Sequence, residues 1–465
     1  MSQKNLFCAL ILAAGKGTRM HSRKPKVLHT MLDEPLIYYP ISSARNADID
    51  DIAVMVGFAG EQVESYVNSL DDKIEVIWQR EQLGTGHAVR LAKDWWSGYS
   101  NVLILAGDAP LITSETLELF MQRHLSSGSK CSLLSFEPSD PTGYGRVIRY
   151  GDSVKIIEHK DATAEEHKCR EVNSGIYIFD SAALASVIDR ITCDNAQKEY
   201  YLPDALSLIE ESGGVIDAVK AVDPDEFLGI NDPVQLAKAT TVMRDKILSK
   251  WMAGNGVKCV DPATTWIGPN VELGEDITIE PSVQIYGRSF IGSGSDIGSF
   301  TVLHNAKIGE NVKILGSVRI NNSSVSNSCS VGPYVFIRDG AELLEDVRVG
   351  RFVEIKKSRI CNGTKVPHLS YIGDAEIGSN TNIGAGTITC NYDGVNKNKT
   401  IIGNDCFIGS DTMLIAPLNI GNNAMTAAGS TITNDIPDEA LGIGRARQSI
   451  IKDWYSRWHK FKGGK

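Results

Sequence analysis

A glycine-rich, basic loop near the start of the chain has residue types that suit phosphate binding. Gly15 and Gly17 flank a lysine, Arg19 follows them, and Lys26 lies a short distance further along. Closely spaced glycines let backbone N–H groups approach phosphate oxygens, and Arg19 and Lys26 add positive charge. The spacing fits neither the Walker A pattern nor the dinucleotide-binding pattern. The loop therefore indicates a phosphate site of another kind, although a plain turn explains Gly15 and Gly17 alone equally well.

A second set of polar residues lies in the later half of the chain. It contains His368, whose imidazole titrates near neutral pH and so suits a general base. The polar residues around it are Arg338, Glu354, Lys356, Tyr371 and Asn382. A lone histidine is more often structural than catalytic, and a single Arg or Lys is often a solvated surface residue. The residues alone therefore leave a structural and a catalytic role open.

The elements that carry the first loop alternate in type. Short apolar runs occupy residues 6–14, 51–58, 74–79, 101–108 and 131–137, and helix-like stretches separate them. This alternation predicts a Rossmann-like α/β domain built on a parallel sheet. Ligands of such sheets bind at the carboxyl ends of the strands, which is where the glycine-rich loop begins.

The elements around His368 follow a six-residue repeat. A branched aliphatic residue leads every hexad over residues 267–302, namely Ile267, Leu273, Ile279, Ile285, Ile291 and Ile297. This period predicts a left-handed parallel β-helix, whose flat faces favour self-association. Irregular segments at 343–346 and 389–399 predict loops on one face, and the second is long enough to reach a neighbouring subunit.

A helix-like segment separates the two patterns. It opens at Pro233 and stops at the glycines of residues 254–256. We therefore expect a first domain over residues 1–232, a linker helix over 233–256, and a hexapeptide-repeat domain with a C-terminal arm over 257–465. The arm is basic and aromatic. It suits either a membrane-surface segment or, as we favour, an arm folded over the end of the β-helix.

Composition narrows the class of protein. The chain has 465 residues, a net charge of -10, and nine scattered cysteines without metal-ligand spacing. The negative charge argues against nucleic-acid binding, and the cysteine usage favours a reducing, cytoplasmic location. The first apolar run is too short to span a membrane. A cytoplasmic enzyme of small molecules is the expected class.

Longer motifs in the first half resemble those of sugar-nucleotide pyrophosphorylases. The segment 12–20 with Pro25-Lys26 matches that family's signature, and the segments 79–86, 106–108 and 229–233 agree with it. The resemblance implies that Asp108 and Asn231 hold Mg²⁺, that Arg19 and Lys26 are catalytic, and that a sugar pocket lies near Glu158. The residues it implies for binding UTP or the UDP-sugar are Leu12, Ala13, Ala14, Gly15, Gly17, Lys26, Gln79, Gln82, Gly84, Thr85, Ala106, Gly107, Asp108, Gly145, Glu158, Asn173 and Asn231.

Segments 384–394 and 408–412 look like those of hexapeptide acetyltransferases. Together with the first half, they make nearly the whole chain resemble the bacterial bifunctional uridyltransferase–acetyltransferases. That resemblance implies His368 as general base and Glu354 as its orienting partner. It implies sugar-phosphate contacts for Arg338, Lys356, Tyr371, Asn382, Asn391 and Tyr392. It implies acetyl-CoA contacts for Ala385, Asn391, Tyr392, Ser410, Ala428 and Arg445.

The implied function is synthesis of UDP-N-acetylglucosamine by a homotrimer, for peptidoglycan and lipopolysaccharide. Glucosamine 1-phosphate would be acetylated from acetyl-CoA, and the resulting N-acetylglucosamine 1-phosphate would receive UMP from UTP. One alternative is a nucleotidyltransferase whose β-helix only assembles or regulates it. The other is a non-enzymatic assembly subunit that shares both folds. Asp108 and Asn231 argue against the second alternative, and His368 with the loop at Asn391 argues against the first.

Overall fold

The computed structural model describes residues 6–151 and 153–462, and its contacts divide the chain into two compact units. The first unit covers Met1–Asp245 and the second covers Lys246–Lys465. The division falls within the long helix α8 (Pro233–Asn255), which occupies the segment where the sequence predicts a helix.

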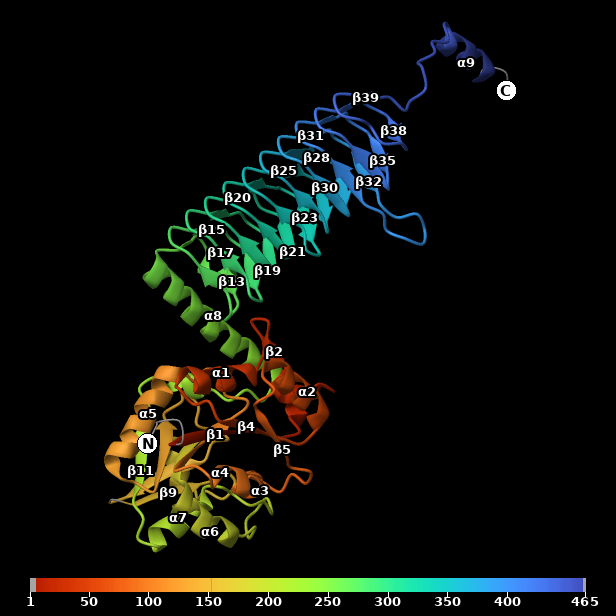
Figure 1. Cartoon of the computed structure of the whole chain (residues 1–465). Helices are drawn as coiled ribbons and strands as arrows, with labels where there is room; N and C mark the ends of the chain where they lie inside the picture. The colour runs from red at the N-terminus through yellow and green to blue at the C-terminus, as the bar shows by residue number, and fades with distance from the viewer. Residues whose placement is uncertain (1–5, 152, 463–465) are drawn as a thin grey trace. The chain divides into compact units, whose positions relative to one another are not determined.

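The first unit is built on a mixed sheet with β1 (Phe7–Ala13) near its centre (Figure 1). The strand order is β11-β7-β10-β6-β1-β4-β5. The other strands of this sheet are β4 (Ile52–Val56), β5 (Glu75–Trp78), β6 (Asn101–Ala106), β7 (Cys131–Phe136), β8 (Arg146–Tyr150), β9 (Ser153–Ile157), β10 (Val172–Asp180) and β11 (Ile216–Lys220). A separate two-stranded ribbon joins β2 (Thr30–Met31) to β3 (Glu34–Pro35).

The prediction of a parallel sheet is only partly correct. Strands β5, β4, β1 and β6 are parallel, whereas β10 lies antiparallel between β6 and β7. The chain reaches β10 after the antiparallel β8–β9 hairpin, which reverses the chain without a helical crossover. The carboxyl ends of β1, β4 and β6 still share one edge, because those strands run in the same direction.

Helices cover both faces of this sheet. The helices on one face are α1 (Tyr38–Asn46), α2 (Gly60–Leu70) and α5 (Ser114–Ser127), and those on the other are α3 (Thr85–Leu91), α4 (Lys93–Trp96), α6 (Ser181–Val187) and α7 (Asp204–Glu211). Ala9 and Ile11 of β1 pack with the first set, while Cys8 and Leu10 pack with the second. The alternation of side chains along a strand therefore gives β1 two buried faces. The predicted Rossmann-like α/β class is confirmed.

The second unit is a parallel β-helix (Figure 1). One of its sheets contains β12 (Lys258–Cys259), β15 (Thr278–Ile279), β18 (Asp296–Ile297), β20 (Lys313–Ile314), β22 (Ser330–Val331), β25 (Arg348–Arg351), β28 (Lys365–His368), β31 (Asn382–Ile383), β34 (Phe407–Ile408), β37 (Met425–Thr426) and β39 (Leu441–Gly442). The other contains β13 (Trp266–Ile267), β14 (Glu272–Leu273), β16 (Gln284–Tyr286), β17 (Phe290–Ile291), β19 (Val302–Ile308), β21 (Val318–Val325), β23 (Val335–Arg338), β24 (Glu342–Leu343), β26 (Val353–Lys356), β27 (Arg359–Ile360), β29 (Tyr371–Gly373), β30 (Ala375–Ile377), β32 (Ile388–Cys390), β33 (Thr400–Ile402), β35 (Met413–Ile415), β36 (Leu418–Ile420) and β38 (Thr431–Ile432).

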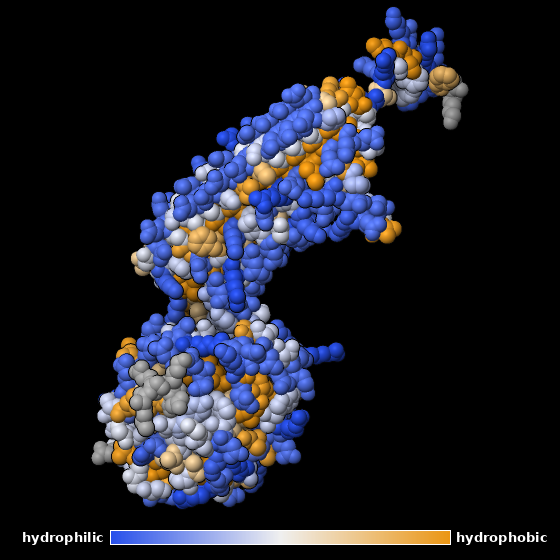
Figure 2. Space-filling model, viewed as in Figure 1, coloured by the Kyte–Doolittle hydropathy of each residue, from blue (hydrophilic) through white to orange (hydrophobic). Residues whose placement is uncertain are grey.

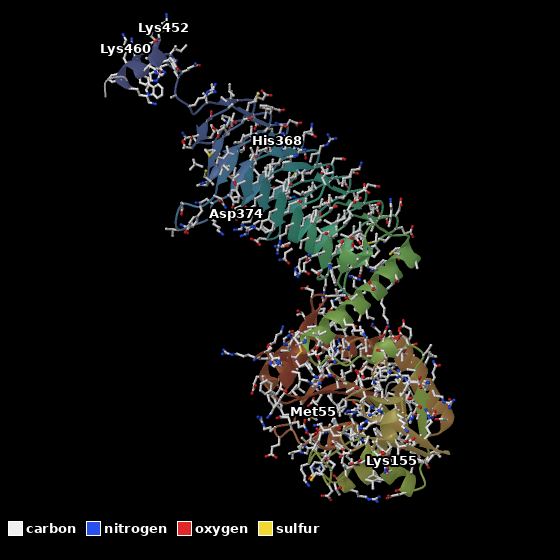
Figure 3. The ribbon with its side chains drawn as sticks, turned by 180° about the vertical axis from the view of Figure 1, so that it is seen from behind. Met55, Lys155, His368, Asp374, Lys452 and Lys460 are labelled. Carbon is white, nitrogen blue, oxygen red and sulfur yellow. The ribbon has the colours of Figure 1, made fainter. Side chains whose placement is uncertain are left out.

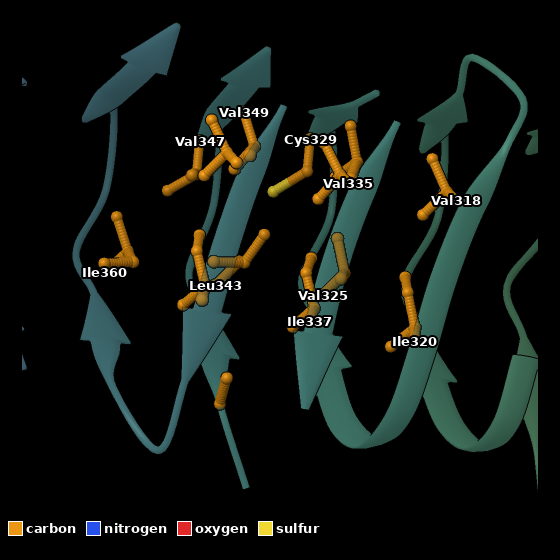
Figure 4. Close-up of a cluster of buried hydrophobic side chains, with 14 of the residues drawn as sticks. Val318, Ile320, Val325, Cys329, Val335, Ile337, Leu343, Val347, Val349 and Ile360 are labelled. Carbon is orange, nitrogen blue, oxygen red and sulfur yellow. The ribbon is translucent and has the colours of Figure 1, made fainter. Parts of the chain in front are cut away.

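The hexad pattern is confirmed by the pairing of successive coils. Ile285 pairs with Leu303, Leu303 with Ile320, and Ile320 with Ile337, so one coil takes about three hexads. These side chains are fully buried and stack into one continuous core, part of which is shown in Figure 4. Ile247 and Trp251 of α8 pack against the same core. The repeat therefore builds a rigid prism on whose faces polar residues can be placed in register.

Two expectations about irregular segments are wrong. Residues 343–346 do not leave the coil, because Leu343 pairs with Val325 and Ile360 while Asp346 makes the turn with a positive φ of 58°. The C-terminal arm, which contains α9 (Trp454–Lys462), does not fold over the β-helix of its own chain. Its described residues from 443 to 462 are exposed throughout, and the rings of Tyr455, Trp458 and His459 contact one another within α9. By contrast, residues 391–399 form the predicted loop between β32 and β33.

Candidate active sites

The glycine-rich loop opens a pocket of about 650 Å³ at the carboxyl ends of β1, β4 and β6. Eleven of the predicted nucleotide-binding residues line it, namely Leu12, Ala13, Ala14, Gly15, Lys26, Gln79, Gln82, Gly84, Thr85, Ala106 and Asp108. The pocket lies where the parallel strands end, as the sequence predicts for a ligand site. Its lining combines apolar walls with lysine, amide and carboxylate groups, which suits a nucleotide with its phosphates.

The sequence analysis missed several residues of this lining. Met55 faces the pocket because β4 lies beside β1, with Met55 paired to Leu12. Glu199 enters from a distant loop, and Gly175 enters from β10. The only sequence signal for Met55 was the apolar run at 51–58, which predicts a strand. A strand that runs parallel to β1 ends at the same edge of the sheet as β1, which is the edge where the pocket lies. Among the predicted residues, Arg19, Gly17 and Gly107 do not line this pocket.

Three side chains from remote parts of the sequence converge beside this pocket. Lys26, in a short 3-10 helix after Pro25, donates from Nζ to Asp108 and, at 3.2 Å, to the side-chain oxygen of Asn231. The backbone also joins these segments, because the Ile230 amide donates to the Asp108 carbonyl at 2.9 Å. The side chains of Lys26 and Asp108 are 14% and 22% exposed, so their charges are only partly screened by solvent. The result is a cationic group held by two oxygen ligands.

The loop that contains Gln79 is held in one conformation by its own hydrogen bonds. Gln79 is buried, and its side chain donates to the carbonyl of Gly84 at 3.0 Å. Gln82 in turn donates to the Gln79 carbonyl at 3.1 Å. Gly84 has a φ of 105°, and a Cβ there would lie 2.6 Å from the carbonyl oxygen of Tyr200. Only glycine fits this position, because any larger residue would collide with the Tyr200 backbone. The close approach holds the loop where Gln79, Gln82 and Gly84 line the pocket.

The predicted sugar-binding residues form a polar group, with Gly145 just before β8, Glu158 just after β9 and Asn173 on β10. The backbone N–H of Asn173 donates to the Gly145 carbonyl at 2.8 Å, and the Gly145 backbone lies close to the Glu158 carboxylate. Burial raises the pKa of Glu158, and the nearby carboxylates of Asp161 and Asp204 add to the shift. A partly buried carboxylate next to an amide can bind sugar hydroxyls. The described structure therefore brings Gly145, Glu158 and Asn173 together, although not in the lining of the nucleotide pocket.

On the β-helix, three of the predicted sugar-phosphate residues, Arg338, Lys356 and Tyr371, share one face, whereas Asn382 lies on β31 in the sheet that contains His368. Strand pairing places Arg338 beside Lys356 and Glu354 beside Tyr371 on adjacent coils. The Glu354 carboxylate accepts from Arg338 Nε at 2.9 Å and from its Nη2 at 2.7 Å. A pocket of about 510 Å³ adjoins this face, and it is lined by Tyr334, Phe336, Phe352, Glu354, Tyr371 and others. The sequence analysis missed the aromatic part of this lining.

His368 lies on a different face of the same prism. It ends β28, and the next residue, Leu369, makes a corner with a φ of 47° before β29 begins at Tyr371. His368 borders a separate pocket of about 310 Å³ with Arg351 and Gly350. Glu354 bonds Arg338 on the neighbouring face, and in the described part of the chain no hydrogen bond joins it to His368. The expected orienting contact between Glu354 and His368 is therefore absent from the described residues of a single chain.

The predicted cofactor residues continue from His368 along the prism. Lys365 pairs with Asn382, Asn382 with Phe407, and Phe407 with Met425. Backbone hydrogen bonds just past these pairs continue the same register from coil to coil and give a column whose members are His368, Ala385, Ser410 and Ala428. Arg445 ends the column, because its Nη1 donates to the Ala428 carbonyl at 2.7 Å. An elongated ligand laid along this column would meet His368 at one end and a guanidinium at the other.

Asp374 anchors the loop of residues 391–399, a role that no sequence motif indicated. Its carboxylate accepts from Asn391 Nδ2 at 2.5 Å, and its carbonyl accepts from the Thr400 amide at 3.2 Å. Asn391 is buried, whereas Tyr392 is 60% exposed and bonds the Gly394 carbonyl. Figure 3 shows the loop leaving the β-helix next to the labelled Asp374. One residue thus holds both ends of the loop.

Metal binding is restricted by the residues present. Within residues 6–151 and 153–462, no group of three or more His, Cys, Asp or Glu side chains is placed to hold a metal ion. The convergence of Asp108 and Asn231 on a cation nevertheless fits Mg²⁺, which commonly takes one or two protein oxygens and completes its shell with phosphates and water. None of the described helices is long and apolar enough to cross a membrane.

Comparisons with known proteins agree with both halves of the chain. Residues 8–222 match the nucleotidyl transferase family, and residues 399–434 match the bacterial transferase hexapeptide family. The bifunctional protein GlmU of Caldanaerobacter subterraneus is 46% identical over 96% of this chain and 97% of its own length. Those of Syntrophotalea carbinolica and Shouchella clausii are 43% and 45% identical over 97% and 96% of this chain, and over 97% and 98% of their own lengths.

These relatives align over both units and not over the first alone. A likeness at this level over nearly the full length rejects the two alternatives that the sequence left open, a single-function enzyme and a non-enzymatic assembly subunit. The chain belongs to the family of bifunctional GlmU proteins, enzymes that join a nucleotidyltransferase to a transferase of the hexapeptide class.

Proposed function

We propose that this chain makes UDP-N-acetylglucosamine in two steps. The β-helix transfers an acetyl group from acetyl-CoA to the amine of glucosamine 1-phosphate. The first unit then joins the product to UMP from UTP and releases pyrophosphate. The observation that carries the proposal is the pocket of about 650 Å³, where the glycine-rich loop, Gln79 and Asp108 line one ligand-sized space and Asn231 is joined to Asp108 through Lys26.

In the uridyl step, the chain mainly positions the reactants and neutralises their charge. The N–H groups of the loop around Gly15 bind phosphate oxygens, and Arg19 and Lys26 add positive charge. Gln79 and Gln82 read the base, while Gly145, Glu158 and Asn173 bind the sugar. Asp108 and Asn231 hold Mg²⁺, which supplies charge neutralisation to the triphosphate. The phosphate of the sugar then attacks the α-phosphorus in line with the leaving pyrophosphate.

In the acetyl step, His368 takes the proton that the attacking amine must lose. Arg338 and Lys356 hold the sugar phosphate, and Tyr371, Asn382, Asn391 and Tyr392 surround the sugar. The column of Ala385, Ser410 and Ala428 supports the elongated cofactor, with Arg445 near its phosphates. Among the described residues of the group around His368, no Cys or Ser has an evident base partner, so direct transfer to the amine is the proposed route.

We also propose that the acetyl site is completed by a second copy within a homotrimer. His368 and the Arg338–Tyr371 group lie on two faces of one prism, separated by the corner at Leu369. That corner carries Leu369, Phe352 and Tyr334, which are 61%, 58% and 57% exposed, and the rings of Tyr334 and Phe352 stack at 5.3 Å. Figure 2 shows that apolar side chains also reach the surface along the β-helix. Exposed apolar residues in register support burial against another copy, and closed threefold symmetry suits a prism.

The product class supports a place in cell-wall synthesis. A nucleotide-activated amino sugar is the donor form used for peptidoglycan and lipopolysaccharide, and the reaction needs substrates that the cytoplasm supplies. We therefore propose a cytoplasmic location. The two activities predict no dependence on a membrane or on nucleic acid.

Mass spectrometry of products tests this proposal. The full chain is incubated with glucosamine 1-phosphate, acetyl-CoA, UTP and Mg²⁺. Asp108→Ala should stop at N-acetylglucosamine 1-phosphate, whereas His368→Ala should slow acetylation by about 10²- to 10⁴-fold and still convert supplied N-acetylglucosamine 1-phosphate. Equal loss of both activities in either variant would contradict the assignment of two separate sites. Failure of the parent to acetylate would leave only the nucleotidyltransferase.

A further inference from the structure

The ammonium group of Lys26 occupies the position that the proposed metal ion requires. Its Nζ contacts the Asp108 carboxylate and lies 3.2 Å from the side-chain oxygen of Asn231. These two oxygens come from distant segments of the first unit, after β6 and before α8. Within residues 6–151 and 153–462, Lys26 Nζ bonds those two oxygens, which are the same two that fit Mg²⁺.

Two cations cannot share this pair of oxygens at hydrogen-bond distance. Mg²⁺ lies about 2.0–2.1 Å from each ligand oxygen, so it needs the place that the ammonium group takes between Asp108 and Asn231. An ammonium left in place would repel the ion at short range in a partly buried site. Lys26 must therefore withdraw before the ion can contact Asp108, and its side chain needs another anion once it has left.

We propose that Lys26 is a built-in competitor of the metal ion at Asp108 and Asn231. The phosphates of the nucleotide release it by accepting its ammonium group, because Lys26 also lines the adjoining pocket. Metal and polyphosphate binding are then coupled through one lysine, and the ion binds weakly until phosphate arrives. This inference rests on the proposed function, since it takes the pocket to be the nucleotide site.

The test measures binding of Mn²⁺ alone, by the electron paramagnetic resonance signal of the free ion. Mn²⁺ prefers the same oxygen ligands as Mg²⁺. In the full chain, Lys26→Met should bind Mn²⁺ more tightly than the parent, by a factor within the range of about 5- to 150-fold that is typical of coupled sites. Lys26→Arg keeps a cation at the site and should remain close to the parent. Lys16→Met removes a lysine of the same pocket that contacts neither oxygen, and it should also match the parent.

A second measurement adds inorganic tripolyphosphate. It should tighten Mn²⁺ binding to the parent more than to Lys26→Met, after correction for Mn²⁺ bound to tripolyphosphate in buffer. An unchanged midpoint of thermal unfolding of the first unit would show that each variant is folded. Equal Mn²⁺ affinity in the parent and Lys26→Met would overturn the competition, provided that Asp108→Asn loses the ion. If Asp108→Asn binds Mn²⁺ as the parent does, both the competition and the proposed metal site are wrong.

Discussion

Gly350→Ala is predicted to damage acetyl transfer through the backbone that carries His368. A Cβ at position 350 would lie 1.9 Å from the carbonyl oxygen of Pro367, whereas Cβ atoms in proteins do not come within 3.0 Å of other atoms. Pro367 directly precedes His368, and both belong to β28, which pairs with β25. The added methyl group therefore has to push the coil that ends at His368.

The size of the effect follows from this distance. The carbonyl oxygen must retreat by about 1 Å, and a misplacement of about 1 Å typically costs about 10²-fold in rate. That factor corresponds to about 2.7 kcal/mol of transition-state stabilisation. We expect the kcat for acetyl transfer to fall by about this factor. Uridyl transfer in the other unit should keep its rate.

Two glycines provide matched controls. Gly292→Ala also forces a Cβ against the next coil, with the Gly309 carbonyl carbon at 2.5 Å, but it lies well before the coils that contain His368. It should lower the thermal midpoint and spare acetyl transfer. Gly98→Ala meets its nearest atom at 3.7 Å and should be neutral. If Gly350→Ala acetylates within about threefold of the parent while Gly292→Ala loses stability, the position of His368 does not limit the reaction and the argument from distance fails.

Three further predictions concern other parts of the chain. Burial lowers the pKa of His124 from 6.5 to about 4, so the unfolded chain binds the proton first as the pH falls, and the stability from this group is complete above about pH 6.5 and is lost towards pH 4. In urea titrations, the difference in unfolding free energy between pH 7.5 and pH 5 should be smaller for His124→Gln than for the parent, and an unchanged difference would refute the assignment. Asp374→Ala should slow acetyl transfer about tenfold or more, because it releases Asn391, whereas Asp374→Asn should keep most activity, because its amide oxygen can still accept the hydrogen bond. Equal losses of acetyl transfer in both variants would count against a positioning role for Asp374. Phe352→Arg should shift the sedimentation coefficient from trimer towards monomer and leave uridyl transfer intact, and a stable trimer would show that the interface lies elsewhere.

Much of this protein is determined by local sequence. The hexads specify the β-helix because a buried aliphatic residue must recur at every turn of the same coil, and the pairing from Ile285 to Ile337 follows that spacing. The glycine-rich loop is likewise local, since its shape depends on adjacent residues after β1. Most of the nucleotide pocket was predictable from the resemblance of such short motifs to those of sugar-nucleotide pyrophosphorylases, including Gln79 and Gly84.

The tertiary structure decided which distant residues meet. Strand order placed β10 antiparallel between β6 and β7, and it brought Met55 and Glu199 into the nucleotide pocket. No local pattern encodes such contacts, because they depend on how far-apart segments are paired and on which side of each strand a residue falls. The same holds for the contact of Lys26 with Asp108 and Asn231, which joins three segments. It also holds for the corner at Leu369, where a single left-handed residue turns the chain and sends His368 and Tyr371 to different faces.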